Sequence, residues 1–119
     1  LEETRATISF ATGMAAISAT FLALLRAGDH VVSSRYVFGN TASVLRTLEG
    51  FRVDVSHVDS TDASQVAAAL RPNTRLVFVE TIANPRTQVA DLAAIGELCR
   101  RGGVVLVVDN TMTTPELFK

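Results

Sequence analysis

The acid at the end of segment 104–109 has the clearest chemical meaning in the chain. Asp109 follows five apolar residues, Val104 to Val108, a run that predicts a buried strand. A buried carboxylate without a partner costs several kcal/mol, so Asp109 should face water or meet a cation or a strong hydrogen-bond donor. Ligands of open α/β sheets bind beyond the carboxyl ends of strands, which makes a cationic ligand atom one candidate partner. The alternative is a solvated loop acid that merely follows a strand.

Residues near the start of the chain have the pattern of an anion site. A short strand is predicted at 8–10, and apolar residues then recur at helical spacing, namely Met14, Ile17, Phe21 and Leu24. A helix beginning near Gly13 would offer its free N–H groups and dipole to an anion, with no side chain in the way. Thr12 can cap this helix or donate its hydroxyl to the same anion. The alternative is an ordinary glycine at a strand-to-helix joint.

Composition indicates one globular unit and excludes several function classes. The chain has 119 residues, is 48% hydrophobic and carries a net charge of −1, without a basic patch for nucleic acid. Its apolar runs are shorter than the roughly 20 residues of a membrane span, and Leu1 does not open a signal peptide. The lone Cys99 cannot form an internal disulfide and is expected to be a small core residue. We therefore expect a cytoplasmic protein without a metal site.

Strand and helix patterns alternate along the rest of the chain. Strands are predicted at 30–34, 51–55, 76–79 and 104–108. Helices are predicted from Gly13 to Gly28, through Val44 to Gly50, from Asp62 and Gln65 to Pro72, and through Leu92 to Gly102. Strands that are apolar on both faces and joined by helices predict an α/β fold, a three-layer sandwich around a mostly parallel sheet.

This topology predicts where a site would form. The carboxyl ends of parallel strands meet at one edge of the sheet. The segments expected there are Thr12–Gly13, Tyr36–Gly39, Glu80–Asn84 and Asp109–Thr111.

Six motifs together are similar to those of a known enzyme family. They are Ala11–Ala16, Gly28–Val32, Val37–Thr41, Arg71–Thr74, Glu80–Pro85 and Val107–Thr111. In this order they resemble the cystathionine gamma-synthase-like family, the pyridoxal-phosphate enzymes of cysteine and methionine metabolism. The resemblance implies the aspartate-aminotransferase-like (type I) fold, with residues 1–119 as part of the large cofactor-binding domain.

The resemblance also implies roles for the residues at the two ends of the chain. The backbone N–H groups of Gly13 and Met14 would bind the cofactor phosphate, in agreement with the helix-start argument, with Thr12 beside them. Asp109 would pair with the pyridine nitrogen. Holding that nitrogen protonated turns the ring into an electron sink.

The remaining implied cofactor-binding residues come from the middle of the chain and the end of the last strand. Asn84 would hydrogen-bond the 3′-oxygen of the ring, Thr111 would lie beside the ring face, and Glu80 would stand behind the groups that touch the cofactor. Phe38 departs from the family, in which most members have tyrosine; it keeps the stacking, worth about 0.5–1.5 kcal/mol, and lacks the hydroxyl. This feature is similar to the O-succinylhomoserine sulfhydrylase branch. Tyr36 is expected to be structural, with a hydroxyl role at the site as the alternative.

The family's catalytic lysine has no counterpart in these residues. Members hold the cofactor as a Schiff base with a lysine in a Ser-x-Thr-Lys motif, whereas Lys119 follows Asp109 by ten positions in a different context. We therefore assign no catalytic residue in this chain. We expect it to be a fragment that lacks the N-terminal arm, the lysine segment and the C-terminal domain, to be inactive alone, and to bind pyridoxal phosphate weakly.

The function implied for the parent protein is that of a transferase of trans-sulfuration. An O-succinylhomoserine or O-acetylhomoserine sulfhydrylase would make homocysteine by gamma-replacement, with sulfide or a thiol as the second substrate, in methionine biosynthesis. Cystathionine gamma-synthase, cystathionine gamma-lyase and methionine gamma-lyase stay open as alternatives, as do the acyl group and the sulfur donor. The family implies a homotetramer.

Two further classes compete with this interpretation. A dinucleotide-binding or flavodoxin-like domain also has a parallel sheet with glycine at its first turn, but the chain has no Gly-x-Gly-x-x-Gly motif. The other class is a catalytically silent α/β assembly fragment.

Overall fold

A computed structural model describes residues 4–117, in which four strands form a parallel sheet. The strands are β1 (His30–Ser34), β2 (Asp54–Val58), β3 (Thr74–Glu80) and β4 (Val105–Asp109). They lie in the order β2-β1-β3-β4, and each neighbouring pair is parallel. The predicted α/β class with a parallel sheet is therefore confirmed.

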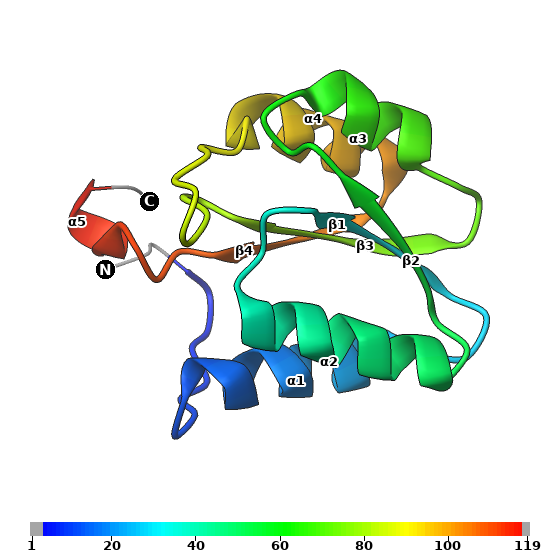
Figure 1. Ribbon diagram of the computed structural model, residues 1–119, viewed down its shortest axis with the longest axis horizontal. Coiled ribbons are helices and arrows are strands. Elements are labelled where there is room, and N and C mark those ends of the chain that lie inside the picture. The colour runs from blue at the N-terminus through cyan, green and yellow to red at the C-terminus, as the bar shows by residue number, and fades with distance from the viewer. Residues whose placement is uncertain (1–3, 118–119) are drawn as a thin grey trace.

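Helices cover both faces of this sheet and complete the predicted three layers. They are α1 (Gly13–Leu24), α2 (Gly39–Gly50), α3 (Ala63–Ala69), α4 (Leu92–Gly102) and the short α5 (Thr114–Leu117). Figure 1 shows α1 and α2 on one face of the sheet and α3 and α4 on the other. The carboxyl ends of the strands all point to the left in this view, where the loops that lead into α2 and α5 lie.

A separate apolar core fills each interface between helices and sheet. On the side of α1 and α2, the rings of Phe21 and Phe78 meet edge to face with centroids 5.3 Å apart. On the other side, Val77, Ile95 and Cys99 belong to one buried cluster, so Cys99 is a core residue as predicted. Burying each such large side chain stabilises the fold by about 1.5–3 kcal/mol, which holds the strand ends in fixed positions.

Helix α1 starts as predicted and ends earlier than predicted. Thr12 is its N-cap, with extended backbone angles and a side-chain oxygen that accepts a hydrogen bond from the Ala15 N–H at 3.1 Å. The predicted end was Gly28, but the helix stops at Leu24. The reason lies in Arg26, whose guanidinium donates to the carbonyl oxygens of the last turn and whose N–H donates to Asp29 at 2.7 Å. These contacts close a turn before β1 begins.

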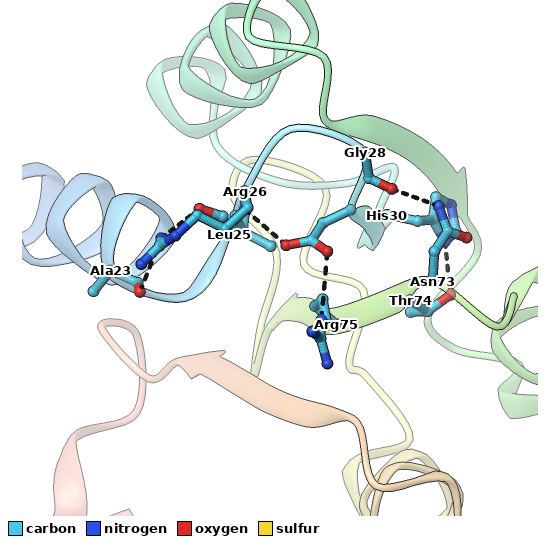
Figure 2. A network of polar contacts seen from close by, with 9 residues as sticks. Ala23, Leu25, Arg26, Gly28, His30, Asn73, Thr74 and Arg75 are labelled. Carbon is cyan, nitrogen blue, oxygen red and sulfur yellow. Dashed lines mark hydrogen bonds and ion pairs between the residues drawn. The ribbon is translucent and has the colours of Figure 1, made fainter.

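A polar network fixes the edge of the sheet where the strands begin. Figure 2 shows His30 against Thr74 and Gly28 against Asn73, and these contacts join the turn before β1 to the start of β3. The buried His30 ring is 2.7 Å from the Thr74 hydroxyl and 2.9 Å from the Ser56 hydroxyl. Burial, followed by the nearby Arg71 cation, lowers the pKa of His30 below its ordinary value of 6.5. The ring is therefore a neutral structural group.

Strand β2 begins three residues later than the predicted 51–55, at Asp54. The N–H groups of Phe51 and Arg52 donate to carbonyls of the last turn of α2, which keeps these residues in a turn. Arg52 has a positive φ of 62°, a conformation that no strand residue adopts. Phe51 is accordingly 62% exposed rather than part of the sheet.

Two apolar segments are less buried than the sequence predicts. The predicted strand at 8–10 is wrong, because these residues have no strand partner in the described part of the chain, and Ile8 is 79% exposed. The predicted strand at 104–108 is found one residue later, as β4 at Val105–Asp109, and β4 is the edge of the described sheet. Val105 is therefore 45% and Val108 36% exposed, where full burial was expected.

Residues 4–117 contain no helix with the length and apolar character needed to cross a membrane. The same residues contain no cluster of three or more His, Cys, Asp or Glu side chains suited to a metal ion. Lys119, the residue on which the argument about the family lysine rests, lies outside the described residues, as does Leu1.

Candidate functional site

A cavity of about 330 Å³ opens at the edge of the sheet where the strands end. All eight residues that the sequence singles out for a cofactor line it: Thr12, Gly13, Met14, Phe38, Glu80, Asn84, Asp109 and Thr111. They come from four segments, the starts of α1 and α2 and the loops that follow β3 and β4. Gly13 and Asp109, which the sequence analysis expects at one edge of the sheet, both line this cavity.

The start of α1 supplies the features of an anion site. N–H groups in the first turn of a helix have no acceptor within the helix, and Gly13 and Met14 are the first two residues of α1. A Cβ atom placed on Gly13 would meet no protein atom within 4 Å, so the backbone faces open space. The helix dipole adds positive potential at this point. An anion can therefore approach the amides directly.

Asp109 supplies negative charge in the same cavity. It is the last residue of β4 and is half-buried, and its carboxylate accepts hydrogen bonds from the N–H (3.0 Å) and the hydroxyl of Thr111. Its backbone carbonyl accepts a hydrogen bond from the Thr81 N–H at 3.0 Å. Among residues 4–117, no Arg side chain forms an ion pair with this carboxylate. The charge faces a cavity in which a cationic ligand atom would stabilise it.

Glu80 is a second carboxylate at this edge, and it is only 6% exposed. It ends β3 in register with Asp109 on β4. Its two oxygens accept hydrogen bonds from the N–H groups of Phe38 at 2.6 Å and Asn84 at 3.3 Å. Burial raises the pKa of Glu80 above its ordinary value; these two bonds oppose the shift, and the Asp109 charge adds to it.

Phe38 and Asn84 bring an aromatic ring and a side-chain amide to the cavity wall. Phe38 is the N-cap of α2, makes no side-chain capping bond, and is 44% exposed. Asn84 is exposed and precedes a cis peptide bond to Pro85. The cavity thus combines a stacking surface, an amide, an acid and a helix N-terminus.

Four lining residues were not assigned to the site from the sequence, namely Ile17, Thr41, Ile82 and Met112, although Ile82 belongs to the segment Glu80–Asn84 that was expected at this edge. For two of them a signal exists, because helical spacing places Ile17 four residues after Gly13 and Thr41 three residues after Phe38, on the same helix faces. The Thr41 hydroxyl lies 4.0 Å from the sulfur of Met14, so these two helix starts touch at the site. Met112 lies in the loop between β4 and α5, and no local sequence pattern predicts the path of that loop.

Tyr36 has a structural position, as the sequence analysis favoured. Its hydroxyl donates a hydrogen bond to Asp59 at 2.7 Å, and its N–H donates to the Ser34 hydroxyl at 3.1 Å. It is not among the residues that line the cavity. The hydrogen bond between the Tyr36 hydroxyl and the Asp59 carboxylate raises the pKa of Tyr36 and lowers that of Asp59. The pair anchors the loop that carries Phe38.

Comparisons with known proteins agree on one enzyme family. A family model described as Cys/Met metabolism PLP-dependent enzyme matches residues 1–119. Canavanine gamma-lyase from Pseudomonas canavaninivorans is 40% identical over 121 residues, covering 100% of this chain and 30% of that protein. O-succinylhomoserine sulfhydrylase from Pseudomonas aeruginosa is 39% identical over 118 residues, covering 98% of this chain and 29% of that protein.

A solved structure agrees with the sequence relatives. The O-acetylhomoserine sulfhydrylase of the methionine biosynthetic pathway of Wolinella succinogenes superposes with a TM-score of 0.84 at 47% identity, covering 88% of this chain and 30% of that one. The chain therefore spans about 30% of the length of the relatives that it matches.

Proposed function

This chain belongs to the family of Cys/Met metabolism PLP-dependent enzymes, and on that premise we propose that it is part of the cofactor-binding domain of an O-acylhomoserine sulfhydrylase. The complete enzyme would replace the acyloxy group of O-succinylhomoserine or O-acetylhomoserine with sulfide or a thiol. With sulfide the product is homocysteine. The observation that carries the proposal is the single cavity that holds the start of α1, Phe38, Asn84 and Asp109 together.

The residues of the cavity fit pyridoxal phosphate. An anion matches the first amides of α1, those of Gly13 and Met14, and the position of a Cβ atom on Gly13 meets no other side chain within 4 Å. A protonated ring nitrogen matches Asp109, a half-buried acid without an ion-pair partner among residues 4–117. The volume of about 330 Å³ lies within the range of small-molecule sites.

Each residue has a separate task in this proposal. When bound, pyridoxal phosphate supplies an electron sink for negative charge that develops on the substrate. Asp109 would keep the ring nitrogen protonated, and the Asn84 amide would donate to the 3′-oxygen. Thr111 holds the Asp109 carboxylate in place through its N–H and hydroxyl. Phe38 would supply a stacking surface for the ring and exclude water from it.

The amine that carries the cofactor and moves substrate protons is not assigned to this chain. We propose that a lysine outside the 119 residues supplies it, because the chain spans about 30% of the length of its relatives. The site described here then orients the cofactor, and the rest of the protein completes the chemistry.

Two observations favour a sulfhydrylase over other members of the family. The identity to the superposed O-acetylhomoserine sulfhydrylase is 47% over 88% of this chain, and that to the O-succinylhomoserine sulfhydrylase of Pseudomonas aeruginosa is 39% over 98%. Phe38 also stands where most members have tyrosine, and phenylalanine at this position is similar to the O-succinylhomoserine sulfhydrylase branch. The second candidate is a gamma-lyase, which the 40% identity to an L-methionine gamma-lyase from Pseudomonas deceptionensis supports.

Product analysis with the enzyme expressed from its complete gene tests the proposal. O-succinylhomoserine and O-acetylhomoserine are each supplied with sulfide, and homocysteine is measured; methionine and cystathionine are supplied alone, and 2-oxo acid is measured. We expect homocysteine from at least one O-acyl substrate at a higher kcat/KM than any cleavage reaction. Faster 2-oxo acid release from methionine or cystathionine would instead identify a lyase.

A further inference from the structure

The buried carboxylate of Glu80 has a role that the cofactor contacts alone do not explain. We propose that Glu80 is a positioning residue that holds the Phe38 ring and the Asn84 amide in one fixed arrangement. The inference rests on the proposed function, because both of these groups are proposed to contact pyridoxal phosphate. Glu80 itself would act through them rather than on the cofactor.

The contacts of Glu80 join two segments that are distant in the sequence. One carboxylate oxygen accepts from the N–H of Phe38, 42 residues away, at 2.6 Å. The other accepts from the N–H of Asn84, four residues away, at 3.3 Å. These segments follow different strands, β1 and β3, and the carboxylate bridges the gap between their loops. Each bond fixes the backbone of a residue whose side chain lines the cavity.

The start of α2 explains why an acid is needed at this point. Phe38 is the N-cap residue of α2, and its side chain cannot accept a hydrogen bond from the helix. Glu80, on a neighbouring strand, accepts instead from the N–H of Phe38 itself, and its negative charge interacts favourably with the helix dipole. An N–H group that meets a carboxylate forms a strong, charge-assisted bond. The orientation of Phe38 therefore depends on Glu80.

The electrostatics of Glu80 favour such a role over a stabilising one. The residue is buried and stands in register with another acid, Asp109, and no cation among residues 4–117 pairs with it. Burial and the nearby Asp109 charge both raise its pKa, so ionisation of Glu80 is unfavourable for folding. A neutral side chain here would avoid the cost of burying a charge beside Asp109.

Glu80→Gln in the full-length enzyme tests the proposal. An amide has one acceptor oxygen, which the short bond to Phe38 retains, so its NH₂ group faces the Asn84 N–H and that contact is lost. We expect the dissociation constant for pyridoxal phosphate to rise about tenfold and the circular dichroism of the bound cofactor to change. Asp62→Asn is the matched control, because Asp62 also accepts a backbone N–H, at the start of α3 away from the cavity.

A double-mutant cycle separates positioning from a general loss of stability. If Glu80 acts through Asn84, then Glu80→Gln in an Asn84→Ala background should weaken cofactor binding by less than about threefold. An equal effect of Glu80→Gln in both backgrounds would overturn the proposal, as would unchanged binding in the single variant. Asp62→Asn should leave the dissociation constant unchanged in both backgrounds.

A second variant and a measurement on the unsubstituted enzyme distinguish a wrong role for Glu80 from a folding defect and from a wrong proposed function. If Glu80→Gln fails to fold, Glu80→Asp is tested in the same cycle, because aspartate keeps the charge and is too short to reach both N–H groups. Binding of the cofactor by the unsubstituted enzyme tests the proposed function by itself. Its absence would contradict the proposed function, whereas normal binding with additive effects would overturn only the role of Glu80.

Discussion

Asp109 provides the charge on which cofactor recognition depends at the scale of single residues. Its carboxylate is oriented by the Thr111 N–H and hydroxyl and faces the cavity without an ion-pair partner among residues 4–117. A neutral amide in its place would keep the shape and lose the attraction for a protonated ring nitrogen. The carboxylate is therefore more important for function than for folding.

Asp109→Asn in the full-length enzyme is expected to weaken binding of pyridoxal phosphate by about 30-fold or more, the effect of breaking a partly buried charge pair. Cofactor titration followed by absorbance measures this change. Asp91→Asn serves as control, because Asp91 caps α4 and asparagine caps equally well. Equal affinity in the Asp109→Asn variant and the wild type would show that the acid does not meet the ring nitrogen.

Phe38 supplies a ring whose contribution can be separated from its missing hydroxyl. Phe38→Leu should raise the cofactor dissociation constant by about 2- to 12-fold, which corresponds to a stacking energy of 0.5–1.5 kcal/mol. Phe38→Tyr should bind as the wild type does, because the side chain is 44% exposed and has room for a hydroxyl. Stronger binding by Phe38→Leu than by Phe38→Tyr would exclude stacking.

The site residues follow from sequence patterns to different degrees. Gly13 and Asp109 are predictable because a helix start binds anions and an acid at a strand end needs a partner. The contacts of Glu80 are not predictable in this way, since one of them depends on the loop that carries Phe38, 42 residues earlier in the chain. To predict that Ile17 and Thr41 line the cavity, one must know which face of each helix turns toward the cavity, as well as that the helix exists.

Element boundaries depend on local contacts that the apolar pattern does not contain. The late start of β2 follows from the positive φ of Arg52, and the early end of α1 follows from the capping guanidinium of Arg26. The periodicity of α2 and α4, by contrast, predicts both helices well, because each buries a regular apolar face. Exposure of β4 reflects its place at the edge of the described sheet, which no property of the strand itself reveals.

The network around His30 gives the starting edge of the sheet a pH dependence. Because its pKa is lowered in the fold, the unfolded chain binds this proton more readily than the native state does. The stability contributed by neutral His30 is thus present above pH 6.5 and is lost as pH falls below that value. The charges that face the ring are the ion-paired Arg71 and Asp54, 3.5 Å apart.

His30→Phe is expected to lower the free energy of unfolding by about 1–3 kcal/mol at neutral pH, because it removes two buried hydrogen bonds. The substitution should also reduce the decrease in the free energy of unfolding that the unsubstituted protein shows between about pH 7 and pH 5. Urea denaturation at several pH values measures both effects, with His57→Asn, an exposed histidine of β2, as control. An unchanged pH slope in His30→Phe would contradict this account.

The whole molecule separates stability from function between the two edges of its sheet. The edge where strands begin carries the closed polar network of Figure 2, whereas the edge where they end carries the open cavity and its loops. Figure 1 shows that the helices cover the faces between these edges. The sheet therefore presents four loop segments at one end, which is the usual arrangement for ligands in α/β proteins.

The 119-residue chain expressed alone is expected to be inactive and to bind pyridoxal phosphate weakly. Its one lysine, Lys119, is not assigned as the covalent anchor. Borohydride reduction after incubation with the cofactor, followed by peptide mass analysis, should find no stoichiometric pyridoxyl group on Lys119. A stoichiometric adduct there that disappears in Asp109→Asn would show that the assignment is wrong.

A crystal structure of the full-length enzyme grown with the cofactor would show whether this cavity holds pyridoxal phosphate in one orientation. We expect density for the phosphate at the N–H groups of Gly13 and Met14, and the ring nitrogen against the carboxylate of Asp109. Cofactor density elsewhere in the molecule, or a phosphate group against Asp109, would contradict the account.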